Sequence, residues 1–311
     1  MVFVETIKQN GKQYFYVSKN FRIGKNKWKR IKKYAGKKKP SKDEIKKLAE
    51  EIETKAKEKG IIIPESRYAF LSEEQAEVLE DLKTAYSKWW KKLPKETKEK
   101  YESDFLVRFT YNSNAIEGNS LSLRDTNLIL QENIIPSDIT EREYKEVLNG
   151  KRAMEFIKEY RGEVNKTFVL KIHKLVTKNI LETAGNYRQT NVIIQGSEHR
   201  PPNVKEVPNL MKKFFIWYNN NKNNYHPLEL AGLVHAKFVR IHPFSDGNGR
   251  TARLIMNFTL HKSGYPMFVI KNAERRAYYN TLEQSDSGNN KEFILLLFKN
   301  VINQHGNYLH K

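Results

Sequence analysis

Apolar residues recur at steps of three and four positions over most of the chain after residue 72, which is the spacing of helices that bury one face. Residues that cap helices precede several of these runs, because Ser72 with Gln75 and Thr140 with Glu143 have the capping-box spacing. The chain is therefore expected to be mainly α-helical. Helices are predicted over residues 41–59, 72–90, 94–117, 122–133, 140–161, 167–182, 230–241, 250–263, 273–284 and 291–304.

The first 35 residues have a different pattern, in which apolar and β-branched residues alternate with polar ones as in strands. Val2 and Phe3 would lie on opposite faces of the first strand, and both faces carry apolar residues, so the pattern leaves the buried face open. Turn residues at Asn10–Gly11 and near Gly24 predict two further strands of a small antiparallel meander. The basic, helix-breaking run 36–40 predicts a linker.

A second strand-like stretch interrupts the helical region. Gly185 ends a helix pattern, and residues 187–194 are rich in aromatic and β-branched residues. The turn residues 195–197 follow, so a β-hairpin is predicted over about 187–202.

These patterns together predict a mainly α protein with one hairpin and a small β-rich N-terminal segment. Three regions are expected, namely a basic segment at 1–60, a helical region at 61–120 and a core at 121–311.

Charge is distributed unevenly along the chain. The net charge is +20, and residues 1–60 hold about 19 Lys and Arg against about 7 acidic residues. Aromatic residues interleave with the basic ones over residues 1–40, a combination that can bind nucleic acid. A lysine-rich solvated surface with aromatics that pack against each other explains the same pattern, so both interpretations stay open.

Other features of the composition narrow the function. The chain has no cysteine, which excludes disulfides and thiolate metal sites. No apolar run approaches the roughly 18 residues of a membrane-spanning helix, and the N-terminus does not have the pattern of a signal peptide. A cytoplasmic protein without a membrane partner is the expectation.

The stretch Ile241–Arg253 gathers several kinds of chemistry in one loop between two predicted helices. Pro243 disfavours the α conformation at His242, which places this imidazole at the end of a helix, where it can accept a proton near neutral pH. The run Gly247–Gly249 would open the next helix and let its backbone amides approach an anion such as phosphate.

Three further side chains add to this loop. Arg250 and Arg253 lie three positions apart, so they share a helix face from which both guanidinium groups can bind phosphate oxygens. Asp246 offers an oxygen ligand of the kind that Mg²⁺ prefers. A base, a metal ligand and a phosphate-binding surface therefore lie within one short stretch.

Residues His242–Arg253 resemble the signature H-x-F-x-D/E-G-N-G-R-x-x-R of the Fic (filamentation induced by cAMP) domain family, and no position departs from it. The resemblance spans about residues 105–300 and implies a Fic-type helical bundle with a β-hairpin flap. It implies AMP transfer from ATP, with Mg²⁺, to a Ser, Thr or Tyr hydroxyl of a protein. It also implies that His242 is the catalytic base and Asp246 the metal ligand. The nucleotide-binding residues it implies are Gly247, Asn248, Gly249, Arg250, Arg253, Tyr279 and Asn280.

A second motif resembles the inhibitory sequence S/T-x-x-x-E-G/N of class II Fic proteins, which lies N-terminal to the signature. Ser113, Glu117 and Gly118 match it. The resemblance implies that Glu117 pairs with Arg253, so that this arginine cannot hold the γ-phosphate of ATP. In some relatives the same glutamate positions a water that removes AMP, so reversal of the reaction is also an expectation.

The resemblance also implies a partner. The flap at 187–202 would pair with an extended segment of a target protein, and self-modification is expected. It also allows a homodimer, although no residue pattern in the chain predicts one. His173 is interpreted as a packing histidine rather than a catalytic one.

Three other functions stay open. The same scaffold can transfer another nucleotide, phosphate or phosphocholine. The basic segment can make the chain a nucleic-acid-binding regulator with a secondary or silent Fic core. A metal-dependent phosphohydrolase is disfavoured, because such two-metal sites need several clustered His and carboxylate ligands.

Overall fold

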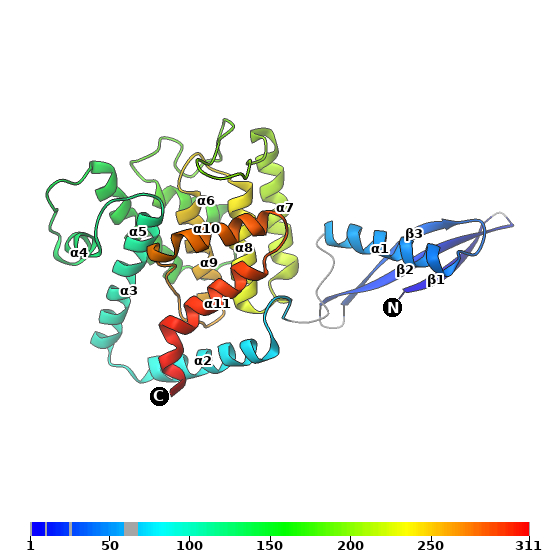
Figure 1. Ribbon diagram of the computed structural model, residues 1–311, viewed down its shortest axis with the longest axis horizontal. Coiled ribbons are helices and arrows are strands. Elements are labelled where there is room, and N and C mark those ends of the chain that lie inside the picture. Colours follow the sequence, from blue (N-terminus) through cyan, green and yellow to red (C-terminus); the bar gives the residue numbers. More distant parts are fainter. Residues whose placement is uncertain (1, 10, 25–26, 59–67, 311) are drawn as a thin grey trace. The chain divides into compact units, whose positions relative to one another are not determined.

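The computed structural model describes residues 2–9, 11–24, 27–58 and 68–310 (Figure 1). The chain divides into two compact units, each with its own internal contacts. The smaller comprises Met1–Arg67 with Trp217–Tyr225, and the larger comprises Tyr68–Ile216 with His226–Lys311. The predicted division at about residue 120 stays a prediction.

The smaller unit contains a three-stranded antiparallel sheet in the order β1-β2-β3 and one helix. The strands are β1 (Val2–Gln9), β2 (Lys12–Gly24) and β3 (Lys27–Gly36), and the helix is α1 (Lys42–Glu58). The predicted meander is confirmed. The predicted turn residues Asn10 and 25–26, and the predicted helix end at Gly60, lie outside the described residues.

Helix α1 covers one face of this sheet. Val17 and Phe21 of β2 are buried against Ile52 and Ala56 of α1, and Val2 packs against the same cluster. The face that Val2 belongs to is therefore the buried one, which settles the question that the alternation pattern leaves open. The predicted capping box forms, because Ser41 and Glu44 exchange hydrogen bonds at the start of the helix.

The larger unit is helical, and most of its helices overlap the predicted ones. Helix α7 lies in a stretch for which no helix is predicted, and the helix predicted over 167–182 ends at Val176. The fold class is confirmed. The elements are α2 (Glu73–Lys92), α3 (Lys95–Ile116), α4 (Leu123–Asn127), the π-helical turn η1 (Leu128–Glu132), α5 (Glu141–Glu159), α6 (Lys166–Val176), η2 (Val204–Glu206), α7 (Val207–Asn221), α8 (Pro227–Ile241), α9 (Asn248–Lys262), η3 (Asn272–Glu274), α10 (Arg275–Asp286), α11 (Lys291–His305) and η4 (Gly306–His310).

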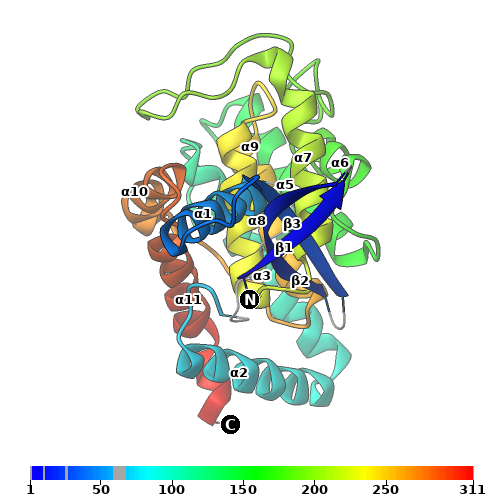
Figure 2. The same cartoon turned by 90° about the vertical axis from the view of Figure 1, so that its right-hand side faces the viewer.

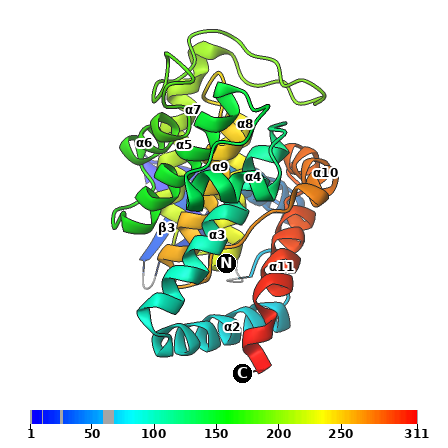
Figure 3. The same cartoon turned by 90° about the vertical axis from the view of Figure 1, so that its left-hand side faces the viewer.

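Helix α9 is the centre of this unit. Twelve of its fifteen residues are buried, and it contacts α3, α5, α6 and α8. Figures 1 and 3 show it enclosed by these neighbours. Its N-terminus follows the loop that joins it to α8, so the residues of the loop and of the first turns of α9 are held by the rigid core of the bundle.

Residues 187–202 do not form the predicted β-hairpin. They form an extended loop with a turn at Gln195–Gly196, and no strand is present among them. Figures 2 and 3 show this segment as a yellow-green loop that projects beyond the helices. Its two ends are held by the Arg188 side chain, which donates to the Thr190 and Pro202 carbonyls at 3.0 and 2.5 Å. Proline at 201 and 202 also removes two backbone donors that a strand ladder would need.

No helix among the described residues combines the length and the apolar run that crossing a bilayer requires.

Candidate active site

His242 ends α8 in an unusual backbone conformation. Its φ of 50° and ψ of 60° are left-handed, which few residues other than glycine adopt, and its N–H donates to the Phe238 carbonyl at 3.1 Å. Arg188 stabilises this turn, since its Nε donates to the His242 carbonyl at 2.9 Å and its backbone N–H donates to the Pro243 carbonyl at 2.9 Å. Strained residues of this kind cluster at functional sites.

The ring of His242 is neutral at physiological pH. Burial lowers its pKa to about 4, and the nearby Val239 carbonyl, which favours the charged form, opposes this only in part. A neutral imidazole has a free nitrogen that can accept a proton, so this residue is a competent base.

The loop after His242 is held by side chains from within it and from α6. Asn248 accepts from the Phe244 N–H at 3.0 Å and donates to the Phe244 carbonyl at 2.9 Å. Its side chain thus fixes the loop, which leaves its backbone amide for a ligand. Gly247 has a φ of 76°, and a Cβ there would lie 2.9 Å from a methyl group of Thr177. Glycine is therefore required at this position.

His173 of α6 packs against the same loop. Its ring stacks on Phe244 at 3.6 Å with an interplanar angle of 2°. The Gly185 N–H donates to Nδ1 at 3.0 Å, and Nε2 lies 3.1 Å from the Asp246 carbonyl. Because Nδ1 accepts, Nε2 must carry the proton and donate. The interpretation of His173 as a packing histidine agrees with these contacts.

We expect His173 to stay neutral, with its proton on Nε2, at pH 5. Burial lowers its pKa to about 4, well below the ordinary value near 6.5. ¹⁵N NMR of the ring nitrogens checks the expectation, with the urea-unfolded chain as the control in which every histidine titrates normally. A His173 ring that gains its second proton near pH 6.5 in the folded chain would contradict the geometry described above.

Arg253 lies in the second turn of α9 and is 2 % exposed. Its Nη2 lies 2.8 Å from Glu117 Oε1 and donates to the Ser113 carbonyl at 2.7 Å, while its Nε donates to Ser113 Oγ at 3.0 Å. Burial alone would lower its pKa, but the charge of Glu117 raises the pKa above the ordinary value. This guanidinium is therefore paired with a carboxylate 136 positions away in sequence.

The backbone around Glu117 is suited to this pairing. Glu117 is the C-cap residue directly after α3, and Gly118 follows with a φ of 99°, which turns the chain away from the helix. A Cβ on Gly249 would lie 2.2 Å from Glu117 Oε1. The glycine at 249 thus provides the room in which the carboxylate reaches Arg253.

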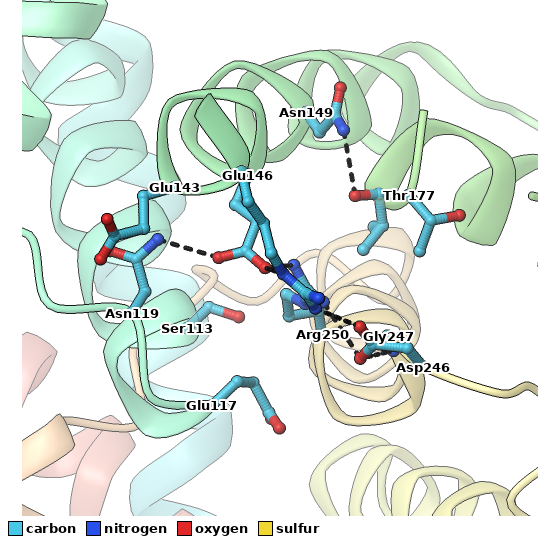
Figure 4. Close-up of polar contacts among 12 residues, drawn as sticks. Ser113, Glu117, Asn119, Glu143, Glu146, Asn149, Thr177, Asp246, Gly247 and Arg250 are labelled. Atoms are coloured by element: carbon cyan, nitrogen blue, oxygen red, sulfur yellow. Dashed lines mark hydrogen bonds and ion pairs between the residues drawn. The ribbon is translucent and has the colours of Figure 1, made fainter. Parts of the chain in front are cut away.

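Asp246 binds two arginines. Its Oδ1 accepts from the Gly247 N–H at 2.5 Å and from Arg250 Nη2 at 3.3 Å, and its Oδ2 contacts Arg142 Nη2 of α5 (Figure 4 shows Asp246, Gly247 and Arg250). Burial alone would raise its pKa, but these donors outweigh it and hold the pKa below the usual range. The carboxylate is therefore charged at neutral pH.

Glu146 of α5 is a buried carboxylate that the sequence analysis does not identify. It pairs with Arg250 Nη1 at 2.9 Å and Arg142 Nε at 3.2 Å, and it accepts from Asn119 Nδ2 at 2.8 Å (Figure 4). The only signal for it in sequence is the four-residue step from Arg142 to Glu146, a common helical ion pair. Arg250 is thus held between two carboxylates, one from each side.

Asp246 is the carboxylate of this loop that could bind a magnesium ion. No cluster of three or more His, Asp or Glu side chains suited to a metal occurs among residues 2–9, 11–24, 27–58 and 68–310. Mg²⁺ often binds through one or two carboxylates, several waters and the phosphates of a nucleotide. Asp246 fits such a site, provided that the nucleotide supplies the other ligands.

Two predicted nucleotide-binding residues lie on α10. The hydroxyl of Tyr279 donates to the Ile116 carbonyl at 3.2 Å, and the Arg275 guanidinium lies 5.5 Å from its ring centre. Asn280 is exposed. Tyr279 therefore lies beside the end of α3 that carries Glu117, which the sequence spacing alone does not show.

Comparisons with known proteins agree with this site. A model of the Fic/DOC family matches residues 163–260. The protein adenylyltransferase Fic of Aedes aegypti is 34 % identical over 206 residues, which cover 62 % of this chain and 40 % of that protein. The protein of the same name from Nematostella vectensis is 36 % identical over 197 residues, covering 59 % of this chain and 44 % of that protein. The chain thus spans about two fifths of the length of these curated relatives.

Solved structures show the same fold. A Fic-domain-containing signalling protein from Bacteroides thetaiotaomicron has a TM-score of 0.66 and 30 % identity, and the match covers 74 % of this chain and 95 % of that one. Fic-1 from C. elegans has a TM-score of 0.66 and 25 % identity, covering 87 % of this chain and 78 % of that one. The loop between α8 and α9, the helices around it and these matches together show that the chain belongs to the Fic/DOC family.

Proposed function

We propose that the chain is a protein adenylyltransferase, which transfers AMP from ATP to a Ser, Thr or Tyr hydroxyl of a protein and releases pyrophosphate. The observation that carries the proposal is a neutral His242 beside the N-terminus of α9, the helix that carries Arg250 and Arg253. The names of the relatives, protein adenylyltransferase Fic, support the same activity.

In this mechanism His242 accepts the proton of the target hydroxyl as its oxygen attacks the α-phosphorus of ATP. The new P–O bond forms as the bond to pyrophosphate breaks. The backbone amides of Gly247–Gly249 and the dipole of α9 would stabilise the charge on the phosphates. Arg250 and Arg253 would orient the β- and γ-phosphates. A Mg²⁺ ion held by Asp246 would neutralise phosphate charge.

Competition for label tests the donor. Excess unlabelled ATP should suppress incorporation from labelled ATP, whereas UTP, GTP and CDP-choline should not. If one of these other donors suppressed labelling better than ATP, the scaffold would use that donor instead.

We propose that Glu117 inhibits this activity. Glu117 Oε1 forms an ion pair with Arg253 Nη2 at 2.8 Å, and an arginine paired in this way is unavailable to a γ-phosphate. Ser113 adds two hydrogen bonds that fix the same guanidinium. The same site would support a second, hydrolytic reaction, in which a water positioned by Glu117 attacks the phosphorus of protein-bound AMP and the target hydroxyl leaves, so that free AMP is released.

The loop at 187–202 is the proposed docking site for the target. Its backbone is extended without strand partners of its own, and Ile193 is 74 % exposed. An extended target segment could pair with it through backbone hydrogen bonds. A second copy of the chain would also serve as a target, which gives the expected self-modification. A homodimer stays a prediction.

The smaller unit supports a second candidate role, the binding of nucleic acid by residues 1–40. These residues hold 13 Lys and Arg but only one acidic residue, Glu5. A stretch with this excess of positive charge attracts polyanions that come within the distance beyond which salt screens the attraction.

We expect replacement of Arg142 by glutamine to lower the Mg²⁺ concentration needed for ATP binding. Arg142 contacts Oδ2 of Asp246, so a metal ion at Asp246 must compete with it. Because its side chain is 57 % exposed, the competing pair is worth about 0.2–1 kcal/mol, or roughly a 1.5- to 5-fold change. Binding of a fluorescent ATP analogue over a Mg²⁺ titration measures it, with Arg142→Lys as the charge-preserving control. An unchanged Mg²⁺ midpoint in the glutamine variant would refute the competition.

A further inference from the structure

The sheet of the smaller unit has one face that α1 does not cover. Strand alternation places every second residue on this face, and the register brings Tyr16 opposite Tyr34 and Asn20 opposite Arg30. Contacts confirm that these side chains share it, because Arg30 Nε donates to Asn20 Oδ1 at 3.0 Å and Lys32 Nζ lies 5.3 Å from the Tyr16 ring. We call this the open face, made by Phe3, Glu5, Tyr14, Tyr16, Asn20, Trp28, Arg30, Lys32 and Tyr34.

Positive charge is concentrated on the sheet rather than on the helix. The three strands, Val2–Gln9, Lys12–Gly24 and Lys27–Gly36, hold 9 basic residues and one acidic residue, a balance of +8. Residues 41–58 hold 5 basic and 6 acidic residues, a balance of −1. A merely lysine-rich surface would spread its charge over both elements, so this asymmetry favours a polyanion that meets the sheet.

The ion pairs also differ between the two faces of the sheet. On the face covered by α1, Lys19 and Lys33 pair with Glu53 and Glu51 of the helix. On the open face, Arg30 Nη1 forms an ion pair with Oε1 of Glu5 at 3.0 Å, and Glu5 is the single acidic residue among residues 1–40. The helix thus neutralises the lysines that face it. On the open face Arg30 is paired with Glu5, whereas Lys32, which lies over the Tyr16 ring, has no ion pair among those of the described residues, so its charge is available to a partner.

The shape of the open face fits duplex DNA. Three strands spaced by about 4.8 Å span about 10 Å, which matches the width of roughly 12 Å of the major groove. Arginine and asparagine are the side chains that pair with guanine and adenine edges there, and β-sheets are known to read that groove. Asn20 on the central strand β2 and Arg30 opposite it on the edge strand β3 are the pair that would make such contacts.

The aromatic residues favour a duplex over a single strand. Single-stranded nucleic acids bind by stacking their bases on free ring faces. Here Tyr34 packs against Tyr16 at 5.4 Å and Tyr14 at 6.3 Å, and the Lys32 ammonium lies 5.3 Å from the ring centre of Tyr16. These tyrosines are engaged with each other and with a cation, so they support the sheet. Trp28, which is 63 % exposed, is a single ring on this face and does not make a row of platforms for unstacked bases.

We propose that the open face binds duplex DNA in the major groove through Arg30, Asn20 and Lys32. The proposal rests on the nucleic-acid role of residues 1–40 given above and assigns it to one surface and one partner. It is independent of AMP transfer, so a chain without that activity would still bind DNA.

Fluorescence anisotropy of the full chain tests it with a labelled 20-base-pair duplex of mixed sequence and with each of its single strands. The duplex should bind at least tenfold more tightly than either strand. The double variant Arg30→Gln with Lys32→Gln should weaken duplex binding at least tenfold and reduce the slope of log K against log salt by about 1 to 2. The double variant Lys46→Gln with Lys47→Gln removes the same charge from exposed positions of α1 and should change affinity less than threefold.

Each other outcome is decisive. Preference for single strands would overturn the duplex assignment while the nucleic-acid role stands. Equal losses in the two double variants would show that net charge rather than the open face binds DNA. Absence of binding to both forms of DNA would overturn the assignment and the nucleic-acid role together. Thermal unfolding of both variants, whose substitutions lie at surface positions, shows that any loss does not come from unfolding.

Discussion

Replacing Glu117 with glycine should raise self-modification by labelled ATP about 10- to 150-fold. The pair between Glu117 and Arg253 is partly buried, and a hydrogen bond to a charged group of this kind is worth about 1.5–3 kcal/mol. In the proposed inhibition, that energy keeps Arg253 from the γ-phosphate in the wild type. Without the carboxylate the guanidinium is available to ATP, so the expected gain follows from its release.

A matched variant separates the pair from a general loss of negative charge. Glu141→Gln removes a carboxylate that is 80 % exposed and pairs only with Lys145 among the ion pairs of the described residues. It should leave the labelling rate within twofold of the wild type. Equal labelling of the wild type and Glu117→Gly would remove the inhibitory role proposed for Glu117, although the transfer reaction itself could still stand.

Replacing His242 with asparagine should lower AMP transfer about 10²- to 10⁴-fold in the Glu117→Gly background, the range expected for loss of a general base. Asparagine is chosen because it tolerates the left-handed φ of 50° at this position better than alanine does. Initial rates of label incorporation measure the loss.

Nucleotide binding supplies the control for this variant. In the proposed mechanism His242 acts on the target hydroxyl rather than on the phosphates, so the affinity for a fluorescent ATP analogue should change less than threefold. A large fall in ATP affinity would mean that His242 holds the nucleotide, and unchanged transfer would mean that another group is the base.

The loop between α8 and α9, the candidate catalytic loop, could be predicted from sequence because its functional groups lie in consecutive residues. The proline after His242 and the glycine at 247 each impose a local backbone geometry, and the structure has both the helix end and the positive φ that these residues favour. Helix boundaries at Ser72 and Thr140 follow capping rules that act over four residues, and both capping boxes form.

Contacts between distant parts of the chain could not be predicted in this way. Arg142 and Asp246 lie 104 positions apart, and only the packing of α5 beside α9 brings them together. Glu146 looks like an ordinary surface acid in sequence, yet it is buried against Arg250. The pairing of Glu117 with Arg253 was expected only from the family resemblance, since no periodicity links α3 to α9.

The predicted hairpin is wrong for a different reason, because a local pattern that favours a strand does not by itself supply the partner strand. Residues 187–194 have the composition of a strand, but strands need a partner. The return segment carries Pro201 and Pro202, and Arg188 donates to backbone carbonyls of the loop instead of leaving them for a ladder. Strand propensity therefore gives an extended loop here, which suits a segment proposed to pair with another protein.

The intact mass of the Glu117→Gly chain after incubation with ATP and Mg²⁺ tests the central proposal most directly. A gain of one or more AMP units, absent from the same chain carrying His242→Asn, is the predicted result. A gain of phosphate alone, a gain of AMP that persists without the imidazole, or no gain on either this chain or an added protein substrate would contradict AMP transfer by His242.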